Sequence, residues 1–178
     1  MKHDFSLTYT PQIEYNEIGY HTTLAIKKND ILENGFIKST KNNEWLGEGA
    51  YFWDSEKNAQ WWKSTIKKSK KCIFVCELKC PIENYLDLDV EMDRFEAYLR
   101  KYQESMNSQN GFKPKFKSND ERRKFYCDIY CIHNNICILA FTFVHDKFNL
   151  YGFKTGSDRR RQICVRDVRC ISIVEVRE

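Results

Sequence analysis

Long apolar runs are missing from this 178-residue chain, and glycine and proline are scarce, with seven and three residues. No segment approaches the ~18–20 apolar residues that a membrane-spanning helix needs. The first fifteen residues lack the apolar centre of a secretory signal. We therefore expect a cytoplasmic protein without a membrane partner. Internal repeats and low-complexity tracts are also missing.

Paired C-x-x-C units, the usual sign of a structural zinc site, are absent although the chain has eight cysteines. Cys72, Cys76 and Cys80 are evenly spaced, so they would share one face of a strand. Cys127 and Cys131 lie one helical turn apart. Reduced thiols that pack as small hydrophobic groups are the simplest interpretation, with structural zinc as the alternative. We expect no metal.

The composition is that of a folded protein with a mildly basic surface. Hydrophobic residues make up 42% and aromatic residues 15% of the chain, which excludes a mainly disordered protein. The length predicts one domain, residues 1–178. The net charge is +4, and basic residues cluster at 67–71, 113–117, 122–124 and 159–161. Such clusters permit an anionic partner but do not require one.

The order of predicted elements indicates an α+β fold. Hydrophobic periodicity and turn residues place strands near both ends and helices in the middle. Strands are expected at 18–23, 36–39, 50–53, 72–79, 84–88, 136–144, 162–167 and 170–176. Helices are expected at 24–34, 56–68, 89–106 and 120–135, with a loop at 108–120 and a weak strand followed by a loop within 144–161. This order favours a split or two-layer sheet.

Residues 45–53, WLGEGAYFW, combine two of the seven glycines with a concentration of aromatic side chains. Glycine lets a backbone turn tightly and approach a ligand closely. Aromatic faces can bind a flat ring between them. The stretch therefore predicts a pocket for a planar ligand.

Residues 19–62 run GYHTTLAIKKNDILENGFIKSTKNNEWLGEGAYFWDSEKNAQWW. Their order is a strand with histidine, a helix, Asn-Gly-Phe, a loop, Gly-x-Gly-x-Tyr-Phe and a helix that opens near an aspartate. This order and spacing resemble the ADP-ribosyltransferase superfamily, specifically the poly(ADP-ribose) polymerase-like branch with a His–Tyr–Glu triad. The resemblance implies a split two-layer β-sheet core with flanking helices, and NAD+ as co-substrate.

The resemblance assigns catalytic and cofactor-binding roles to particular residues. His21 would bond a ribose hydroxyl of NAD+, and Tyr51 would stack on nicotinamide. Thr22 replaces the usual glycine, whose backbone grips the carboxamide. The backbones of Gly47 and Gly49 would approach the ligand.

Residues 57–61, KNAQW, resemble the family's KSANY segment with a one-residue gap before it. This match places Asn58 near the carboxamide and Trp61 on the second stacking face. Without the gap, Trp62 takes the place of Trp61, so both remain candidates.

Gln162 stands where the family's glutamate precedes its last conserved strand pattern. Glutamine can hydrogen-bond a ribose hydroxyl but cannot accept a proton as a carboxylate does. Many relatives that transfer a single ADP-ribose also lack this glutamate, so the change argues against polymer building. Glu48, Asp158 or the target itself remain open as the source of the base.

Arg159, Arg160 and Arg161 directly precede Gln162. Guanidinium groups bind phosphate oxygens through paired hydrogen bonds, so these arginines could contact the NAD+ pyrophosphate or a phosphate-bearing target. The alternative is an ordinary solvated face.

The other candidates also have ordinary structural interpretations. His21 could be a hydrogen-bonded core histidine, and Tyr51 could belong to a strand core. Gly47 and Gly49 could form a plain turn.

The sequence predicts an NAD-dependent mono-ADP-ribosyltransferase, an enzyme that acts as a toxin or defence effector. The acceptor would be DNA, RNA or protein, with nucleic acid slightly favoured, and an antitoxin could be a further partner. The alternative is a catalytically silent module on the same fold that binds NAD, ADP-ribose or nucleic acid. The tRNA 2′-phosphotransferase type shares the fold, but its His/Arg signatures are not found.

Overall fold

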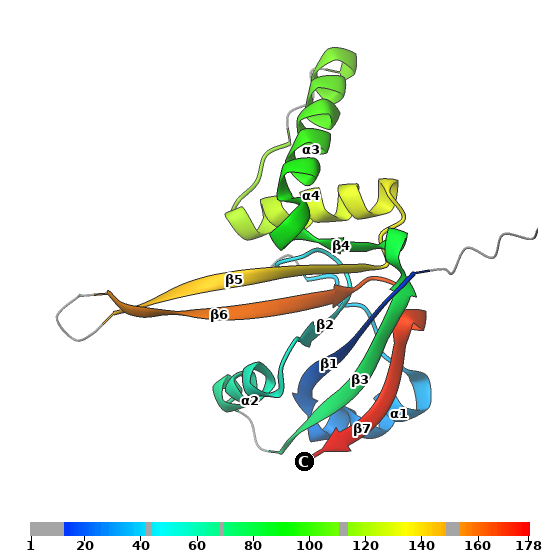
Figure 1. The fold of residues 1–178 in the computed structure, drawn as a ribbon, viewed down its shortest axis with the longest axis vertical. Helices are drawn as coiled ribbons and strands as arrows, with labels where there is room; N and C mark the ends of the chain where they lie inside the picture. Colours follow the sequence, from blue (N-terminus) through cyan, green and yellow to red (C-terminus); the bar gives the residue numbers. More distant parts are fainter. Residues whose placement is uncertain (1–12, 42–43, 68–69, 111–113, 149–153) are drawn as a thin grey trace, which may run out of the picture.

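The computed structural model describes residues 13–41, 44–67, 70–110, 114–148 and 154–178. Within these ranges the chain has an α+β fold with four α-helices and a seven-stranded mixed open sheet (Figure 1). The helices are α1 (Lys28–Asn34), α2 (Glu56–Thr65), α3 (Leu88–Asn110) and α4 (Asn119–His133). The strands are β1 (Glu14–Leu24), β2 (Ala50–Trp53), β3 (Lys71–Pro81), β4 (Tyr85–Asp87), β5 (Ile138–Phe148), β6 (Lys154–Val165) and β7 (Ile171–Arg177).

The strands follow the order β4-β5-β6-β2-β1-β3-β7 across the sheet. The pair β4–β5 is parallel and the other described pairs are antiparallel. In Figure 1, β5 and β6 run across the view, whereas β1, β3 and β7 run steeply. The short strand β2 connects these two parts of the sheet, because it pairs with β6 on one side and with β1 on the other.

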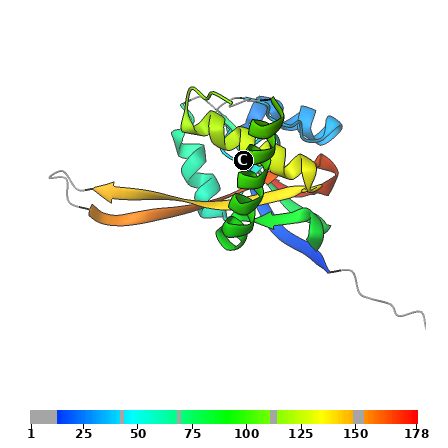
Figure 2. The same ribbon diagram turned by 90° about the horizontal axis from the view of Figure 1, so that it is seen from above.

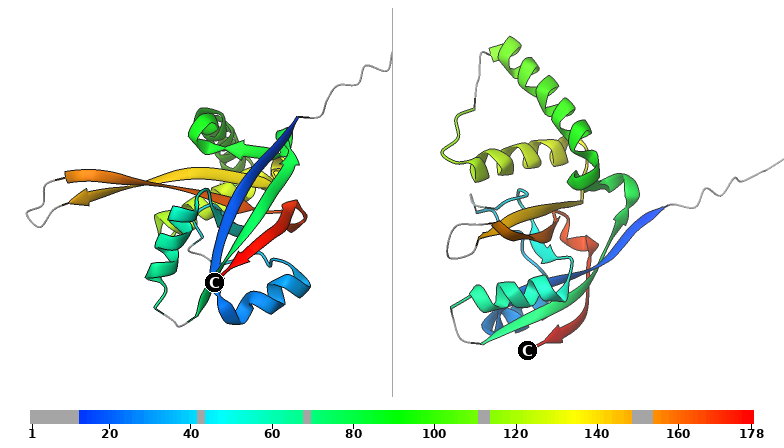
Figure 3. Two further views of the ribbon diagram at one scale, coloured as in Figure 1. Left: turned by 60° about the horizontal axis from the view of Figure 1, so that its bottom comes forward. Right: turned by 60° about the vertical axis from the view of Figure 1, so that its left-hand side comes forward.

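The helices lie at opposite ends of the structure. Helices α3 and α4 cover the end next to β4 and β5, and α1 and α2 lie beside the β1–β3 end (Figure 3). Figure 2 shows the β5–β6 ribbon extending to one side beyond the helices. No helix in the described ranges is both long and apolar enough to cross a membrane.

Strand β3, which lies between β1 and β7, is buried along most of its length. Cys72, Cys76 and Cys80 share one face of it and pack into the same hydrophobic core cluster, as their even spacing predicts. Cys127 and Cys131 are buried in a second cluster beneath α4. These five thiols therefore act as small hydrophobic groups in the core.

Two helix boundaries follow directly from local chemistry. Helix α1 ends at Gly35, whose φ of +78° is the positive value that glycine adopts without a steric penalty. Helix α2 begins after Ser55, whose hydroxyl accepts a hydrogen bond from the Asn58 N–H group. Both boundaries agree with the sequence prediction.

Two predicted elements are wrong. Residues 36–39 form no strand, because only Ser39 pairs, through an isolated bridge to Gly49. The Phe36 ring instead packs into the core beside Phe52 and Phe74.

Strand β6 begins at Lys154 rather than near Gln162, so Arg159, Arg160 and Arg161 lie on a strand and not in the expected loop. The polar sequence still forms a strand, because antiparallel pairing of β6 with β5 provides hydrogen-bond partners for the backbone of these three arginines. Of the expected loop, residues 149–153 lie outside the described residues.

Candidate functional site

A cleft of about 470 Å³ opens between the two parts of the sheet. Strands β1, β2, β5 and β6, helix α2 and the segment before β2 all contribute to it. It is lined by His21, Thr22, Ile37, Ser39, Lys41, Glu44, Trp45, Tyr51, Phe52, Trp53, Trp61, Trp62, His145, Arg160 and Gln162. The structure thus brings together His21, Thr22, Tyr51, Trp61, Trp62, Arg160 and Gln162 of the predicted site.

The His21 imidazole is held by one hydrogen bond and two ring contacts. Its Nδ1 lies 2.7 Å from the carbonyl oxygen of Tyr51, and because a carbonyl only accepts, Nδ1 carries the proton. The rings of Phe36 and Phe52 pack at 5.1 and 5.6 Å. Burial lowers the pKa of His21, against the smaller opposing effect of the Tyr51 bond. The ring is therefore neutral, with Nε2 as an acceptor in the cleft.

Three tryptophans form one wall of the cleft. The ring centroids of Trp53, Trp61 and Trp62 lie 5.9–6.1 Å from one another. The Arg160 guanidinium carbon lies 3.3 Å from the centre of the Trp61 ring, and the same group bonds the Asp158 carboxylate at 2.9 Å. A guanidinium group stacked on indole presents a fixed positive charge next to an aromatic surface.

The Tyr51 hydroxyl fixes the loop before β2. It donates to the Gly47 carbonyl at 2.6 Å and accepts from the Leu46 N–H group at 2.9 Å. Burial raises the pKa of Tyr51, so the phenol stays protonated. Tyr51 also lines the cleft, but its hydroxyl is already engaged in these two hydrogen bonds.

Gln162 lines the cleft, and its side chain has an unusual buried polar atom. Its side-chain Oε1 is buried, and no described residue donates a hydrogen bond to it. The neighbouring strands place Trp53 and Phe141 opposite Gln162. Buried polar atoms in proteins nearly always have a partner, so this oxygen is suited to accept a hydrogen bond from a ligand.

The side chains of Thr22 and Asn58 both form hydrogen bonds with helix α2 or with the residues just before it. The Thr22 hydroxyl donates to the Ala59 carbonyl at 2.9 Å, which joins β1 to the helix. The Asn58 side-chain amide donates to Asp54 Oδ1 at 2.9 Å. Asn58 is not among the residues that line the cleft, so its predicted carboxamide contact has no support from this geometry.

Gly47 and Gly49 have a role different from the predicted approach to a ligand. A Cβ atom on Gly47, whose φ is +92°, would lie 2.3 Å from the Asp128 carboxylate. A Cβ on Gly49 would lie 2.5 Å from the Cys164 sulfur and 2.8 Å from the Val165 carbonyl. Neither glycine lines the cleft. They allow the loop to pack against α4 and β6.

Of the three arginines, only Arg160 lines the cleft. Side chains alternate along a strand, so Arg159 and Arg161 point to the opposite face of β6. Arg159 is exposed. The Arg161 guanidinium group bonds Asp87 at 2.7 Å and Asp89 at 2.6 Å, which fastens β6 to β4 and to the start of α3.

Three titratable side chains that line the cleft, Lys41, Glu44 and His145, were not predicted from the sequence. Glu44 is the one carboxylate among the described lining residues, and its side chain bonds the Ser39 hydroxyl. His145, on β5, lies with its ring centre 6.0 Å from that of Trp45. Glu44 immediately precedes the WLGEG stretch, and this position could have identified it as a candidate cleft residue. His145 is close only because β5 pairs with β6, and no local pattern marks it.

The two carboxylates named as bases from the sequence do not line the cleft. Glu48 bonds the Lys124 ammonium group at 3.2 Å, and Asp158 is paired with Arg160. Glu44 is therefore better placed than either to serve a reaction in the cleft.

A second cavity, of about 260 Å³, lies between α3 and α4. Its lining includes Tyr102, Met106, Phe125 and Tyr126 but no acidic, basic or histidine side chain of the described residues. It offers no acid–base chemistry, in contrast to the cleft.

Comparison with models of known protein families gives no match, and comparison with curated proteins gives no relative. The functional argument therefore depends on the geometry of the cleft and on the sequence pattern.

Proposed function

We propose that this protein is an NAD-dependent mono-ADP-ribosyltransferase, and that the cleft binds the nicotinamide riboside part of NAD+. The observation that carries the proposal is the convergence of His21, Tyr51, Trp61 and Gln162 on one cleft from four different elements. The first and last of them, His21 and Gln162, are 141 positions apart in the sequence. In this proposal the two parts of the sheet correspond to the split sheet of ADP-ribosyltransferases.

The substrate would be held by complementary groups. The flat nicotinamide ring fits between the Tyr51 face and the tryptophan wall. The neutral His21 offers Nε2 as an acceptor for a ribose hydroxyl, and Gln162 Oε1 offers a second acceptor whose need for a partner the ligand would meet. Arg160 places a positive charge near the pyrophosphate.

The reaction breaks the bond between nicotinamide and ribose, which leaves positive charge on the sugar in the transition state. Two hydrogen-bond acceptors beside the ribose favour that charge through their dipoles. Gln162 cannot take a proton, so it supports the transfer of one ADP-ribose rather than chain growth. Glu44 is the carboxylate available in the cleft to remove the proton from an acceptor.

The acceptor in this proposal is a macromolecule, with nucleic acid favoured over protein because of the basic clusters. Part of two clusters, residues 68, 69 and 113, lies outside the described residues. A cytoplasmic toxin or defence effector with an antitoxin partner would fit this activity.

The alternative function is a silent binding module for NAD, ADP-ribose or nucleic acid. The specific observation that favours it is Gln162 in place of an acid, because an amide gives weaker stabilisation to a cationic sugar than a carboxylate does.

The proposal is tested by incubating the protein with NAD+ labelled in the adenylate part, in the presence of a cell lysate. We expect release of nicotinamide and label on a macromolecule, which nuclease or protease treatment then classifies. Background nicotinamide release with no transferred label would favour the binding module.

Matched variants connect this activity to the cleft. Arg160→Ala is expected to raise the apparent KM for NAD+, because the charge beside Trp61 is lost, whereas Arg159→Ala on the opposite face should have little effect. His21→Ala should lose at least tenfold in kcat/KM, the cost of about 1.4 kcal/mol of transition-state stabilisation. Full activity of His21→Ala would contradict the site assignment.

A further inference from the structure

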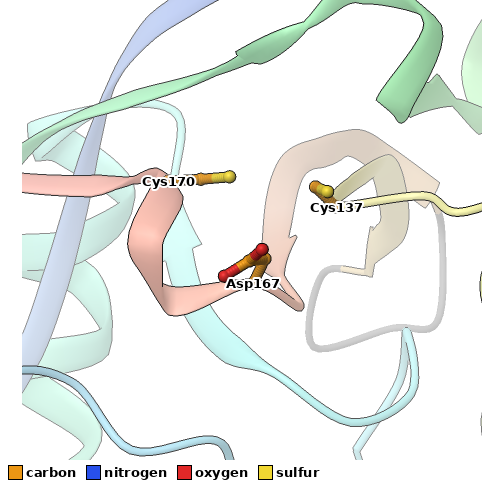
Figure 4. A group of neighbouring side chains, drawn as sticks. All are labelled: Cys137, Asp167 and Cys170. Atoms are coloured by element: carbon orange, nitrogen blue, oxygen red, sulfur yellow. The ribbon is translucent and has the colours of Figure 1, made fainter.

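Cys137, Asp167 and Cys170 form a cluster of metal-ligating side chains outside the cleft. One ligand atom of each lies within 4.8 Å of the others. Figure 4 shows the two thiols and the carboxylate turned toward one another. Cys137 directly precedes β5, Asp167 follows β6, and Cys170 closes the short 3₁₀ turn Val168–Cys170 before β7.

Backbone hydrogen bonds hold these three segments together without any ligand. The Cys137 carbonyl accepts from the N–H groups of Arg166 at 2.7 Å and Asp167 at 3.3 Å. The Cys137 N–H group donates to the Asn84 carbonyl at 2.7 Å, and the Cys170 N–H group donates to the Asp167 carbonyl at 2.9 Å. The three donors are thus preorganised, which reduces the entropy that a ligand must overcome on binding.

A third thiol lies in the same neighbourhood. Cys80, near the end of β3, packs in the same core cluster as Cys137 and Cys170. In the described part of the chain, however, the group whose ligand atoms lie within 4.8 Å of one another does not include Cys80, so its thiol remains a hydrophobic core group. The site itself offers two thiols and one carboxylate, a donor set that suits Zn²⁺ better than Mg²⁺ or Ca²⁺.

The Asp167 carboxylate already interacts with a cationic side chain. The Arg169 guanidinium group donates hydrogen bonds to both oxygens of this carboxylate, at 2.6 to 3.1 Å. The Arg169 side chain that makes these bonds is 88% exposed, and an exposed ion pair of this kind contributes little to stability. A metal ion can therefore replace the guanidinium group at small cost.

We propose that Cys137, Asp167 and Cys170 bind a Zn²⁺ ion, with a water molecule as the fourth ligand. The two thiols lose their protons to solvent as their sulfurs bond the metal, so binding releases two protons and no oxidant or reductant takes part. The site joins the end of β6 to the starts of β5 and β7, and its role is to stabilise that end of the sheet. The sequence analysis expected no metal because the donors come from three separated positions, which a C-x-x-C search cannot detect.

Cobalt titration tests the site directly on the reduced, metal-free full-length protein. Co²⁺ is expected to give one equivalent of sulfur-to-metal charge-transfer absorption and the visible bands of a tetrahedral complex, and Zn²⁺ should displace it. Zn²⁺ should also raise the melting temperature. Absence of a charge-transfer band would overturn the proposal.

Variants distinguish this site from adventitious binding. Cys137→Ser, Cys170→Ser and Asp167→Asn should each weaken Co²⁺ binding at least tenfold. The control Cys72→Ala alters another buried thiol of β3 and should bind as the wild type does. Circular dichroism checks that each variant is folded. Unchanged binding in Cys137→Ser and Cys170→Ser would overturn the site.

Arg169→Ala provides a further check, because it removes a competitor for Asp167 without touching a ligand. We expect equal or tighter Co²⁺ binding, and a loss would contradict the proposed role of Asp167. These readouts are spectroscopic, so they are independent of whether the protein transfers ADP-ribose.

Discussion

The partly buried imidazole of His21 makes the stability of the fold depend on pH. Its pKa is lowered in the folded protein, whereas the unfolded chain titrates near about 6.5. Below about pH 6.5 the unfolded state binds a proton that the folded state resists, so stability is lost as the pH falls. Above that pH both states are neutral and the contribution is constant.

We therefore expect the free energy of unfolding of the wild type to fall more steeply between about pH 6.5 and pH 5 than that of His21→Gln. Urea titrations at a series of pH values measure both curves. Parallel curves in that interval would show that His21 does not titrate as its burial requires.

The unpartnered side-chain oxygen of Gln162 lowers the stability of the fold but is available for binding a ligand. Replacement by methionine removes the unpartnered oxygen at nearly constant shape, and we expect it to leave stability unchanged or to raise it by about 1 kcal/mol. NAD+ affinity should fall about tenfold, the equivalent of one lost hydrogen bond of ~1.4 kcal/mol. Urea unfolding and calorimetric titration measure the two effects.

Gln103→Met is the matched control, because Gln103 donates to the Tyr126 hydroxyl and has a bond to lose. It should not be stabilising and should not alter NAD+ affinity. A stability loss above about 1 kcal/mol in Gln162→Met would mean that its oxygen has a structural partner.

At the scale of residues, the sequence predicted those positions whose chemistry appears in a local pattern. His21, Tyr51, Trp61 and Gln162 were named in advance, and the structure brings them to one cleft. His145 was missed because its proximity to the cleft depends on the pairing of β5 with β6, and Glu44 was missed although it directly precedes the WLGEG stretch. The two glycines were misinterpreted because close packing against Asp128 and Cys164 produces the same local sequence as close approach to a ligand.

At the scale of elements, the helix caps contribute measurable stability. Ser55 and Ser118 each accept a hydrogen bond from an N–H group in the first turn of α2 and α4. We expect Ser55→Ala and Ser118→Ala each to lower the free energy of unfolding by about 1 kcal/mol, and the corresponding glycine variants by only a few tenths.

The two caps are expected to differ in their effect on function. Helix α2 carries Trp61 and Trp62, so Ser55→Ala should also weaken NAD+ binding, whereas α4 contributes no lining residue to the cleft. Equal effects of both variants on binding would indicate that α2 is not part of the binding site.

Most helices and strands were predictable because hydrophobic periodicity and caps are local properties. Strand β6 was placed too late in the chain because its first half, KTGSDRRR, is polar and carries no strand pattern. The ladder with β5 and the ion pairs of Arg161 with β4 and α3 stabilise it instead. The Arg161 ion pairs connect residues more than seventy positions apart, and neither they nor the ladder can be detected in a local sequence pattern.

At the scale of the whole molecule, all eight thiols are free and most are buried. We expect brief alkylation of the native, metal-free protein to modify Cys137 and Cys170 and no other cysteine, because only these two are partly exposed. Alkylation after denaturation should modify all eight. Mass spectrometry counts the adducts, and modification of Cys127 or Cys164 under native conditions would contradict the burial of the second core cluster.

Neighbouring strands of the sheet are paired over very different lengths. Strand β1 pairs with β3 along its whole length, and β5 pairs with β6 almost as completely, but β1 and β2 share a single register pair, Tyr20 with Trp53. His21 lies on one side of this short β1–β2 pairing and Gln162 on the other. A slight rotation of the two parts of the sheet about it would change the distance between the two residues. The entry of a bulky dinucleotide would then be controlled by bending of the sheet itself, without a separate lid.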